Sequence, residues 1–209
     1  MEHIHHSSNP LIKHLVNSLR DTTISPAFFR KNLALIAQNL LLEAAHLLPQ
    51  TTKQITTWQG ENSFSFIDQR QIVCIPILRA GIPMMDGVLE LLPEIQAGFL
   101  AMKRDEKTFK PTIFYKRFPS LANKIIIIVD PMVATGGSLI DAISLIKEEN
   151  PAHIISLNLI AAPEGLHAVS KTHSDVSIFI AQIDDHLNAK KYIIPGLGDA
   201  GDRAYNTEG

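Results

Sequence analysis

The residue types best suited to chemistry are concentrated in residues 130–138, where a single carboxylate, Asp130, precedes a glycine-rich turn. Successive backbone N–H groups in a turn that opens a helix attract an anion. Thr135 and Ser138 add hydroxyl donors beside the two glycines. No lysine follows the second glycine and no G-x-G-x-x-G spacing is present, so the turn matches neither common nucleotide-binding loop. The stretch predicts a cradle for one phosphate with a carboxylate nearby, which suits a ribose 5-phosphate.

The elements around this turn should deliver it to one edge of a sheet. Residues 125–129 are consecutive β-branched residues, which is typical of a central strand covered on both faces. Residues 139–146 carry apolar side chains at helical spacing, and Pro151 provides a stop. Ligands of open α/β sheets collect at the carboxyl ends of the strands. An ordinary βα turn with a helix cap is the alternative interpretation, but an acid directly after a buried strand favours ligand binding.

Arg79 follows a second apolar run, residues 72–78, as Asp130 follows the run at residues 125–129. It precedes an expected helix at residues 83–91. A lone arginine in such a place is most often part of a surface ion pair. Opposite a phosphate cradle, its guanidinium fork would instead match the oxygens of a second anionic group. We therefore expect Arg79 at the same edge of the sheet as Asp130.

A basic segment follows an expected strand at residues 96–102. Residues 103–117 concentrate lysine and arginine between short β-like pieces. A solvated hairpin accounts for most of these charges. The sharper hypothesis is a mobile cationic arm at residues 103–123 that folds over a diphosphate, with Arg104 as its principal contact.

The C-terminal tail has three glycines within residues 196–201, a density that we interpret as too high for a helix or a central strand. The apolar Ile193, Ile194 and Leu197 predict that the tail packs as an ordered loop instead of fraying. Small residues let a backbone approach a ligand closely. Backbone N–H and C=O groups can match the acceptor, donor, acceptor edge of a pyrimidine such as uracil and reject cytosine.

The rest of the chain alternates helices and strands. Two amphipathic helices are expected before residue 50, the second with Ser25 as N-cap, and this pair would suit either a partner subunit or a face of the sheet. Residues 51–68 predict a peripheral strand or hairpin in which Trp58 packs. The histidines of the first six residues are expected in a frayed terminus without a metal. Further strands at 153–162 and 175–181 give an α/β fold with a parallel sheet and right-handed crossovers.

Length, charge and cysteine content limit the number of domains, the partners and the cell compartment that we expect for this protein. With 209 residues, 45% of them hydrophobic, the chain can bury a full core and is most simply one domain, residues 1–209. A formal net charge of −2 gives no broad attraction for nucleic acid or an anionic membrane. The single cysteine, Cys74, lies in an apolar run, which excludes a disulfide within the chain and favours a reducing compartment. The sequence shows no secretory signal and no membrane-spanning run, so we expect a cytoplasmic protein.

Several stretches together resemble one family. Residues 129–138 are similar to the phosphoribosyl diphosphate signature of phosphoribosyltransferases, and Pro131, where many relatives carry a second acid, points to the uracil branch. The other stretches that resemble uracil phosphoribosyltransferase are residues 76–81, 84–90, 161–165 and 192–203. They occur in the family's order and extend the resemblance over nearly the whole chain.

This resemblance implies a fold and a site. The implied fold is the α/β type I phosphoribosyltransferase fold, a central, mostly parallel twisted sheet flanked by helices. It carries an N-terminal helical segment (1–50), a β-hairpin arm (103–123) and a C-terminal base-binding loop or hood (182–209). The residues implied to bind 5-phosphoribosyl 1-diphosphate are Arg79, Arg104, Asp130, Pro131, Met132, Val133, Ala134, Thr135, Gly136, Gly137, Ser138 and Asp199. Those implied to bind uracil are Ile193, Gly198, Asp199 and Ala200, and the catalytic set is Arg79, Arg104, Asp130 and Asp199.

The resemblance also implies a reaction, in which uracil and 5-phosphoribosyl 1-diphosphate give UMP and diphosphate in pyrimidine salvage. Mg²⁺ is implied as cofactor, and because no second acid stands beside Asp130 we expect it to be held through the substrate diphosphate and water and not directly by the protein. A homodimer or higher homo-oligomer and a GTP effector are implied as well, with no nucleic-acid or membrane partner. Two alternatives stay open. An RNA-binding regulator of pyrimidine genes would need a contiguous basic face, and a non-catalytic sensor would need a damaged turn or tail.

Overall fold

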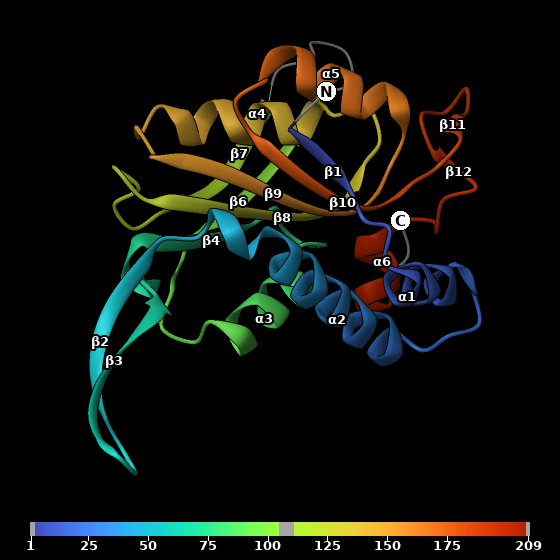
Figure 1. Cartoon of the computed structure of the whole chain (residues 1–209). Helices are drawn as coiled ribbons and strands as arrows, with labels where there is room; N and C mark the ends of the chain where they lie inside the picture. The colour runs from blue at the N-terminus through green and yellow to red at the C-terminus, as the bar shows by residue number, and fades with distance from the viewer. Residues whose placement is uncertain (1–2, 105–110, 208–209) are drawn as a thin grey trace.

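The computed structural model describes residues 3–104 and 111–207, and of residues 103, 104 and 111 it describes the backbone only. In this part of the chain, a six-stranded parallel sheet has the order β1-β10-β9-β8-β4-β5 (Figure 1). The strands are β1 (Ile4–His6), β4 (Ile72–Pro76), β5 (Gln96–Ala97), β8 (Ile125–Val133), β9 (His153–Ala161) and β10 (Ser177–Ile183). The predicted α/β class and the parallel sheet are therefore confirmed.

Helices cover both faces of the sheet (Figure 1). One face carries α1 (Pro10–Arg20), α2 (Pro26–Ala44) and α3 (Ile82–Leu91), and the other carries α4 (Gly137–Lys147) and α5 (Pro163–Thr172). The short 3-10 turns are Ala45–Leu47 and Gln69–Gln71. The N-terminal helical pair thus covers one face of the sheet, which is one of the two placements that the sequence left open.

Strand β8 shows why the sheet needs two layers of helices. Its side chains alternate between two cores, Ile126 and Ile128 packing towards α4 and α5, and Ile127 and Val129 towards α1, α2 and α3. The strand also continues to Val133, so Asp130 lies within β8 and not after it as the sequence suggested.

The order of the strands places a switch point between β4 and β8. After β4 the chain continues outward to β5, whereas after β8 it continues in the opposite direction to β9 and β10. Strand β4 pairs with β8 only as far as Val129, so Asp130 is the first residue of β8 beyond that pairing. Such a reversal opens a crevice at the carboxyl ends of the strands.

The N-terminus differs from the sequence-based expectation. Residues Ile4–His6 form β1 and pair with β10, and the ring of His5 stacks on Phe179 with centroids 4.5 Å apart. The expected fraying is wrong, because β1 supplies backbone partners to the outer edge of β10. The predicted start of α2 is confirmed, since Ser25 Oγ accepts a hydrogen bond from the N–H of Phe28 at 3.2 Å.

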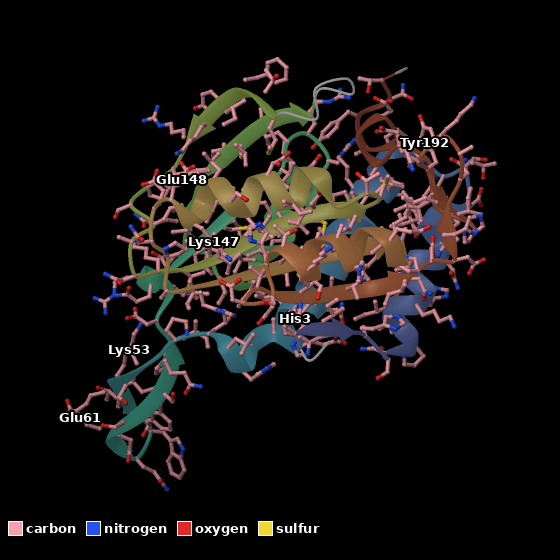
Figure 2. The ribbon with its side chains drawn as sticks, turned by 90° about the horizontal axis from the view of Figure 1, so that it is seen from above. His3, Lys53, Glu61, Lys147, Glu148 and Tyr192 are labelled. Carbon is pink, nitrogen blue, oxygen red and sulfur yellow. The ribbon has the colours of Figure 1, made fainter. Side chains whose placement is uncertain are left out.

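Among the described residues, two long antiparallel hairpins leave the central sheet. The first joins β2 (Gln50–Thr57) to β3 (Gly60–Ile67) and projects clear of the body, as the places of Lys53 and Glu61 in Figure 2 show. Trp58 at its tip is 92% exposed, so the expected packing of this side chain is wrong within the single chain.

The second hairpin pairs β6 (Phe99–Arg104) with β7 (Pro111–Arg117). It corresponds to part of the predicted arm at 103–123, whose residues 105–110 lie outside the described part of the chain. The expected strand at 96–102 is divided, because β5 joins the sheet and β6 joins the hairpin.

The C-terminal tail is ordered, as its apolar residues predicted, but it is not a loop throughout. Strand β11 (His186–Leu187) pairs with β12 (Ile193–Ile194), and residues Ala200–Tyr205 form helix α6. The exclusion of a helix on glycine content was wrong, because α6 includes only the last of the three glycines and Asp199 caps it. No helix in the described ranges is both long and apolar enough to cross a membrane.

Candidate active site

A cavity of about 240 Å³ lies at the switch point between β4 and β8. Its described lining residues are Ile77, Leu78, Ala80, Met102, Asp130, Met132, Val133, Ala134, Thr135, Gly136, Gly137, Ser138 and Leu139. The structure therefore brings the predicted phosphate cradle to one hollow, with the exception of Pro131. The residues that follow β4 form the opposite wall.

The cradle is a tight turn on which α5 presses. Gly136 precedes α4 with a left-handed φ of +78°, and Thr135 Oγ1 accepts a long hydrogen bond, 3.5 Å, from the N–H of Gly137. A Cβ atom at Gly136 would lie 2.7 Å from the carbonyl oxygen of Gly165, and one at Gly165 would lie 2.2 Å from that of Ala134. The two glycines let α4 and α5 begin side by side, so that α5 supports the cradle from behind.

Asp130 is only 9% exposed. Burial raises the pKa of its carboxyl to about 7, while the N–H of Met132, 3.4 Å from Oδ1, opposes the rise. Near neutral pH the carboxyl therefore exists in both forms in the free protein, and a cation or hydroxyl donors in the cavity would favour the charged form. A ribose offers such hydroxyl groups.

Two buried polar residues of β9 hold the backbone at Asp130, and neither was predicted from the sequence. Asn158 Nδ2 donates to the carbonyl oxygen of Asp130 at 2.8 Å, and Ser156 Oγ donates to Asn158 Oδ1 at 2.8 Å. Both are completely buried, and Asn158 stands directly opposite Asp130 in the register of β8 and β9. The signal was available: two polar residues, two positions apart, in a strand that is otherwise apolar after His153.

Arg79 follows β4 between two residues that line the cavity, but its guanidinium is engaged elsewhere. Nη2 lies 3.0 Å from Asp202 Oδ1 and Nη1 lies 3.2 Å from Thr207 Oγ1. The Thr207 hydroxyl, and after it Arg79, lower the pKa of the Asp202 carboxyl. The predicted anion grip is thus linked to the C-terminal helix in this structure, and to bind a diphosphate the guanidinium would exchange these partners.

Asp199 lies close to Arg79. Its Oδ1 accepts a hydrogen bond from the N–H of Asp202 at 2.9 Å and so caps α6. A Cβ atom at Gly201 would be 3.2 Å from Asp199 Oδ1 and 3.8 Å from Arg79 Nη2, so both charged groups border the space that this glycine leaves open.

The residues predicted to read the base lie on the same segment. Ile193 and Ala200 are buried, and Gly198 has a left-handed φ of +79°. Among the described residues, the N–H groups of Gly198 and Ala200 and the carbonyl of Gly198 have no hydrogen-bond partner. These are free backbone donors and an acceptor of the kind that a pyrimidine edge requires.

The remaining predicted groups are described only in part. Arg104 is the last residue of β6, and its side chain is outside the described part of the structure. No group of three or more His, Cys, Asp or Glu side chains suited to a metal occurs within the described residues. Of the described residues that line the cavity, Asp130 alone carries a carboxylate. These donors fit a cation that is held mainly by a bound phosphorylated substrate and water.

Comparison with known proteins identifies the family of the chain. A family model described as uracil phosphoribosyltransferase matches residues 6–207. The chain belongs to the uracil phosphoribosyltransferase family. Similar members are the uracil phosphoribosyltransferases of Aquifex aeolicus, 43% identical over 95% of each chain, and of Ureaplasma urealyticum serovar 10, 42% identical over 96% of this chain and 98% of that protein.

Two solved structures are similar to the chain in fold. A protein from Aquifex aeolicus superimposes with a TM-score of 0.92 at 42% identity, covering 97% of both chains. A hypoxanthine-guanine phosphoribosyltransferase from Bacillus anthracis reaches a TM-score of 0.53 at 13% identity, covering 80% of this chain and 83% of its own. The second likeness shows that the uracil phosphoribosyltransferase family shares its fold with enzymes that act on purines.

Proposed function

We propose that this chain transfers the 5-phosphoribosyl group of 5-phosphoribosyl 1-diphosphate to uracil, which gives UMP and diphosphate. The observation that carries the proposal is the cavity at the switch point, where Asp130 and the cradle of residues 132–138 meet. The chain's membership of the uracil phosphoribosyltransferase family supports the same reaction.

In this reaction the bond from C1 of the ribose to the diphosphate oxygen breaks, and a bond from C1 to N1 of uracil forms. Uracil loses the N1 proton, and diphosphate leaves with the electron pair of the broken bond. Positive charge develops on the sugar and negative charge on the leaving group. Catalysis then depends on positioning and electrostatic stabilisation.

Each predicted site residue has a place in this scheme. The backbone N–H groups and hydroxyls of the cradle would bind the 5-phosphate, and Asp130 would accept hydrogen bonds from the ribose hydroxyls. Arg79 and Arg104 would bind the diphosphate. Asp199 lies beside Arg79, where it either positions groups or accepts the uracil proton. The free backbone groups of Gly198 and Ala200 would bind the uracil edge, and the buried Ile193 would contribute apolar contact.

Mg²⁺ bound to the diphosphate would neutralise charge on the leaving group. We propose that substrate and water hold it, because Asp130 is the one described carboxylate of the cavity. We further propose a cytoplasmic homo-oligomer with GTP as a candidate effector. The buried, unpaired Cys74 supports a reducing compartment.

The test is nucleotide formation by the pure protein with Mg²⁺ and 5-phosphoribosyl 1-diphosphate. Parallel reactions offer uracil, cytosine, hypoxanthine or orotate, each with and without GTP, and one series replaces Mg²⁺ with a chelator. Of the four bases, we expect only uracil to give a nucleotide, UMP, and only when Mg²⁺ is present. Absence of UMP under every condition would refute the proposal, and preference for another base would refute the assignment of the tail.

A further inference from the structure

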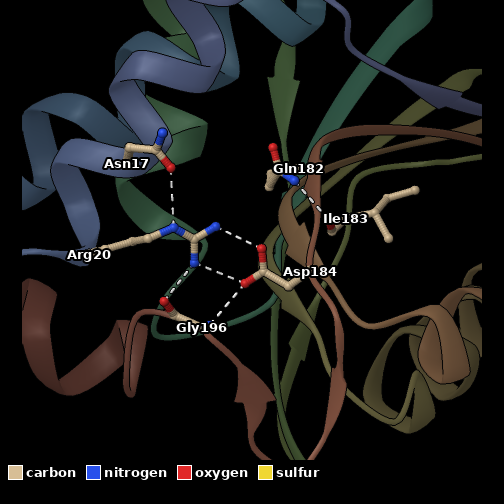
Figure 3. Close-up of polar contacts among 6 residues, drawn as sticks. All are labelled: Asn17, Arg20, Gln182, Ile183, Asp184 and Gly196. Carbon is tan, nitrogen blue, oxygen red and sulfur yellow. Dashed lines mark hydrogen bonds and ion pairs between the residues drawn. The ribbon is translucent and has the colours of Figure 1, made fainter.

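A buried ion pair, Arg20 with Asp184, joins the end of α1 to the residue that follows β10 (Figure 3). Arg20 Nη1 donates to Asp184 Oδ2 at 2.9 Å, and Nη2 donates to Oδ1 at 2.7 Å. The side chain of Asp184 is 2% exposed and that of Arg20 is 21% exposed. A bidentate pair of this kind fixes direction as well as distance.

Both members of the pair also hold Gly196. The N–H of Gly196 donates to Asp184 Oδ2 at 2.9 Å, and its carbonyl accepts from Arg20 Nη1 at 2.7 Å. The turn is tight, because a Cβ atom at Gly196, whose φ is +63°, would lie 2.2 Å from the carbonyl oxygen of Ile193. With donor and acceptor both bound, the peptide units at Gly196 cannot turn unless these bonds to the pair break.

The pair connects this turn to the central sheet. The N–H of Asp184 donates to the carbonyl of Ala161 at the end of β9 at 2.9 Å. On the other flank, Arg203 of α6 donates to the carbonyl of Leu197 at 2.8 Å and to the carbonyl of Leu19 in α1. The turn at Gly196 and Leu197 is therefore tied to the end of α1, directly by Arg20 and indirectly by Arg203.

We propose that Arg20 and Asp184 are positioning residues for the base, which set where the free backbone groups of Gly198 and Ala200 stand. The inference rests on the proposed function, because these groups belong to the proposed uracil site. Neither member of the pair lines the phosphate cavity or touches Arg79 in the described structure. A change in the pair should therefore alter the use of uracil and leave the use of 5-phosphoribosyl 1-diphosphate unaltered.

Lysine at position 20 keeps the charge but lacks the fork, so it cannot bind both oxygens of Asp184 and the carbonyl of Gly196 together. We expect Arg20→Lys to raise the KM for uracil on the order of tenfold or more, because small misplacements of binding groups are costly. The KM for 5-phosphoribosyl 1-diphosphate should stay within about twofold, as for a site left intact. Asp184→Asn, which removes one oxygen acceptor and the charge, should act in the same direction.

The experiment is steady-state kinetics on the full chain, with each substrate varied in turn. Arg70→Lys is the matched control, because Arg70 makes an exposed 3.1 Å pair with Asp68 and its side chain is 81% exposed. The control should leave both KM values unaltered. Equal rises in both KM values, or no rise for uracil, in the folded Arg20→Lys and Asp184→Asn variants would overturn the inference.

Loss of one partner of a buried pair can unfold a protein, so thermal unfolding is followed for each variant. The double variant Arg20→Met/Asp184→Asn leaves no unpaired buried charge and should fold. If it folds and keeps the normal KM for uracil, or if no variant folds, the pair serves the whole fold and the inference is wrong. If the wild type forms no UMP, the proposed function itself has failed; if it forms UMP and the variants keep its KM for uracil, only this inference has failed.

Discussion

A buried carboxyl with a raised pKa makes a folded chain less stable once its proton is lost. For Asp130, burial raises the pKa from 3.8 to about 7. Between about pH 4 and 7 the folded chain keeps a proton that the unfolded chain has released. The free energy of unfolding therefore falls as the pH rises through this window, by up to roughly 4 kcal/mol at about 1.4 kcal/mol per pKa unit.

Asp130→Asn removes this charge, so the variant should lack that part of the pH dependence. Without substrates, we expect the variant to be more stable than the wild type at pH values above about 7, by as much as roughly 4 kcal/mol, and similar to it near pH 4. Urea unfolding across this range measures the difference. If the free energy of unfolding depends on pH in the same way in both proteins, the charged form of Asp130 does not destabilise the folded chain. The same variant should lose most of its activity, because asparagine has one accepting oxygen and no charge where the carboxylate has two accepting oxygens and a negative charge.

Arg79 offers a test of transition-state stabilisation. Loss of one donor to a developing anion commonly lowers the rate by a factor of ~10²–10³, and we expect Arg79→Ala to lower kcat in that range. Arg70→Ala is the control, since it removes an exposed arginine from a comparable pair with Asp68. Turnover assays with both substrates saturating compare the two. Near-normal kcat in Arg79→Ala would remove Arg79 from the catalytic set.

Among the helices, α5 contributes to the site although it lies about thirty residues after the cradle in the sequence. Gly165 in its first turn approaches the cradle so closely that a Cβ atom would lie 2.2 Å from the carbonyl of Ala134. Gly165→Ala should therefore displace the cradle and raise the KM for 5-phosphoribosyl 1-diphosphate by roughly tenfold or more.

Gly87→Ala is the matched control for this prediction, because a Cβ atom there would lie 2.3 Å from the carbonyl of Ala34 where α3 meets α2. This control should lose a few kcal/mol of stability, as overpacked sites do at about 1–3 kcal/mol, and keep its KM. Kinetics and thermal unfolding of both variants separate the two effects. If Gly165→Ala alters stability alone, α5 only covers the sheet.

Elements with a strong local signal were the ones that the sequence predicted. Residues 125–129 predicted a buried strand and Ser25 predicted a helix start, because both patterns reflect local sterics and hydrogen bonds. Strand β1 and helix α6 were missed, since both depend on a partner: β1 on the free edge of β10, and α6 on contacts with α2.

The same division applies to the site. The cradle and Asp130 were predicted because their residues are contiguous. The bonds of Arg79 to Asp202 and Thr207 join residues far apart in sequence, and no local pattern predicts them. Arg20 and Asp184 are 164 positions apart, and only the fold brings them together.

In the molecule as a whole, the β2–β3 hairpin extends from the body without a core of its own. A two-stranded hairpin is marginally stable in water unless it packs against something. This one exposes apolar side chains along its length: Ile55 (41%), Trp58 (92%), Phe64 (43%) and Phe66 (38%). Together with the expected homo-oligomer, this exposure favours a second copy of the chain as the partner that covers the hairpin.

Trp58 is the chain's sole tryptophan, so its fluorescence reports on the hairpin alone. If a second copy covers the hairpin, the emission maximum should lie at short wavelength in concentrated protein and move to longer wavelength on dilution. The shift should follow the fall in molecular mass towards the 23.1 kDa of one chain, measured by light scattering.

Phe66→Ser should weaken the association, because a side chain buried between copies loses its apolar contact. Phe114→Ser, at a residue 69% exposed on the other hairpin, should leave the mass unaltered. A long-wavelength emission at all concentrations, together with a stable oligomer, would place the interface elsewhere on the surface.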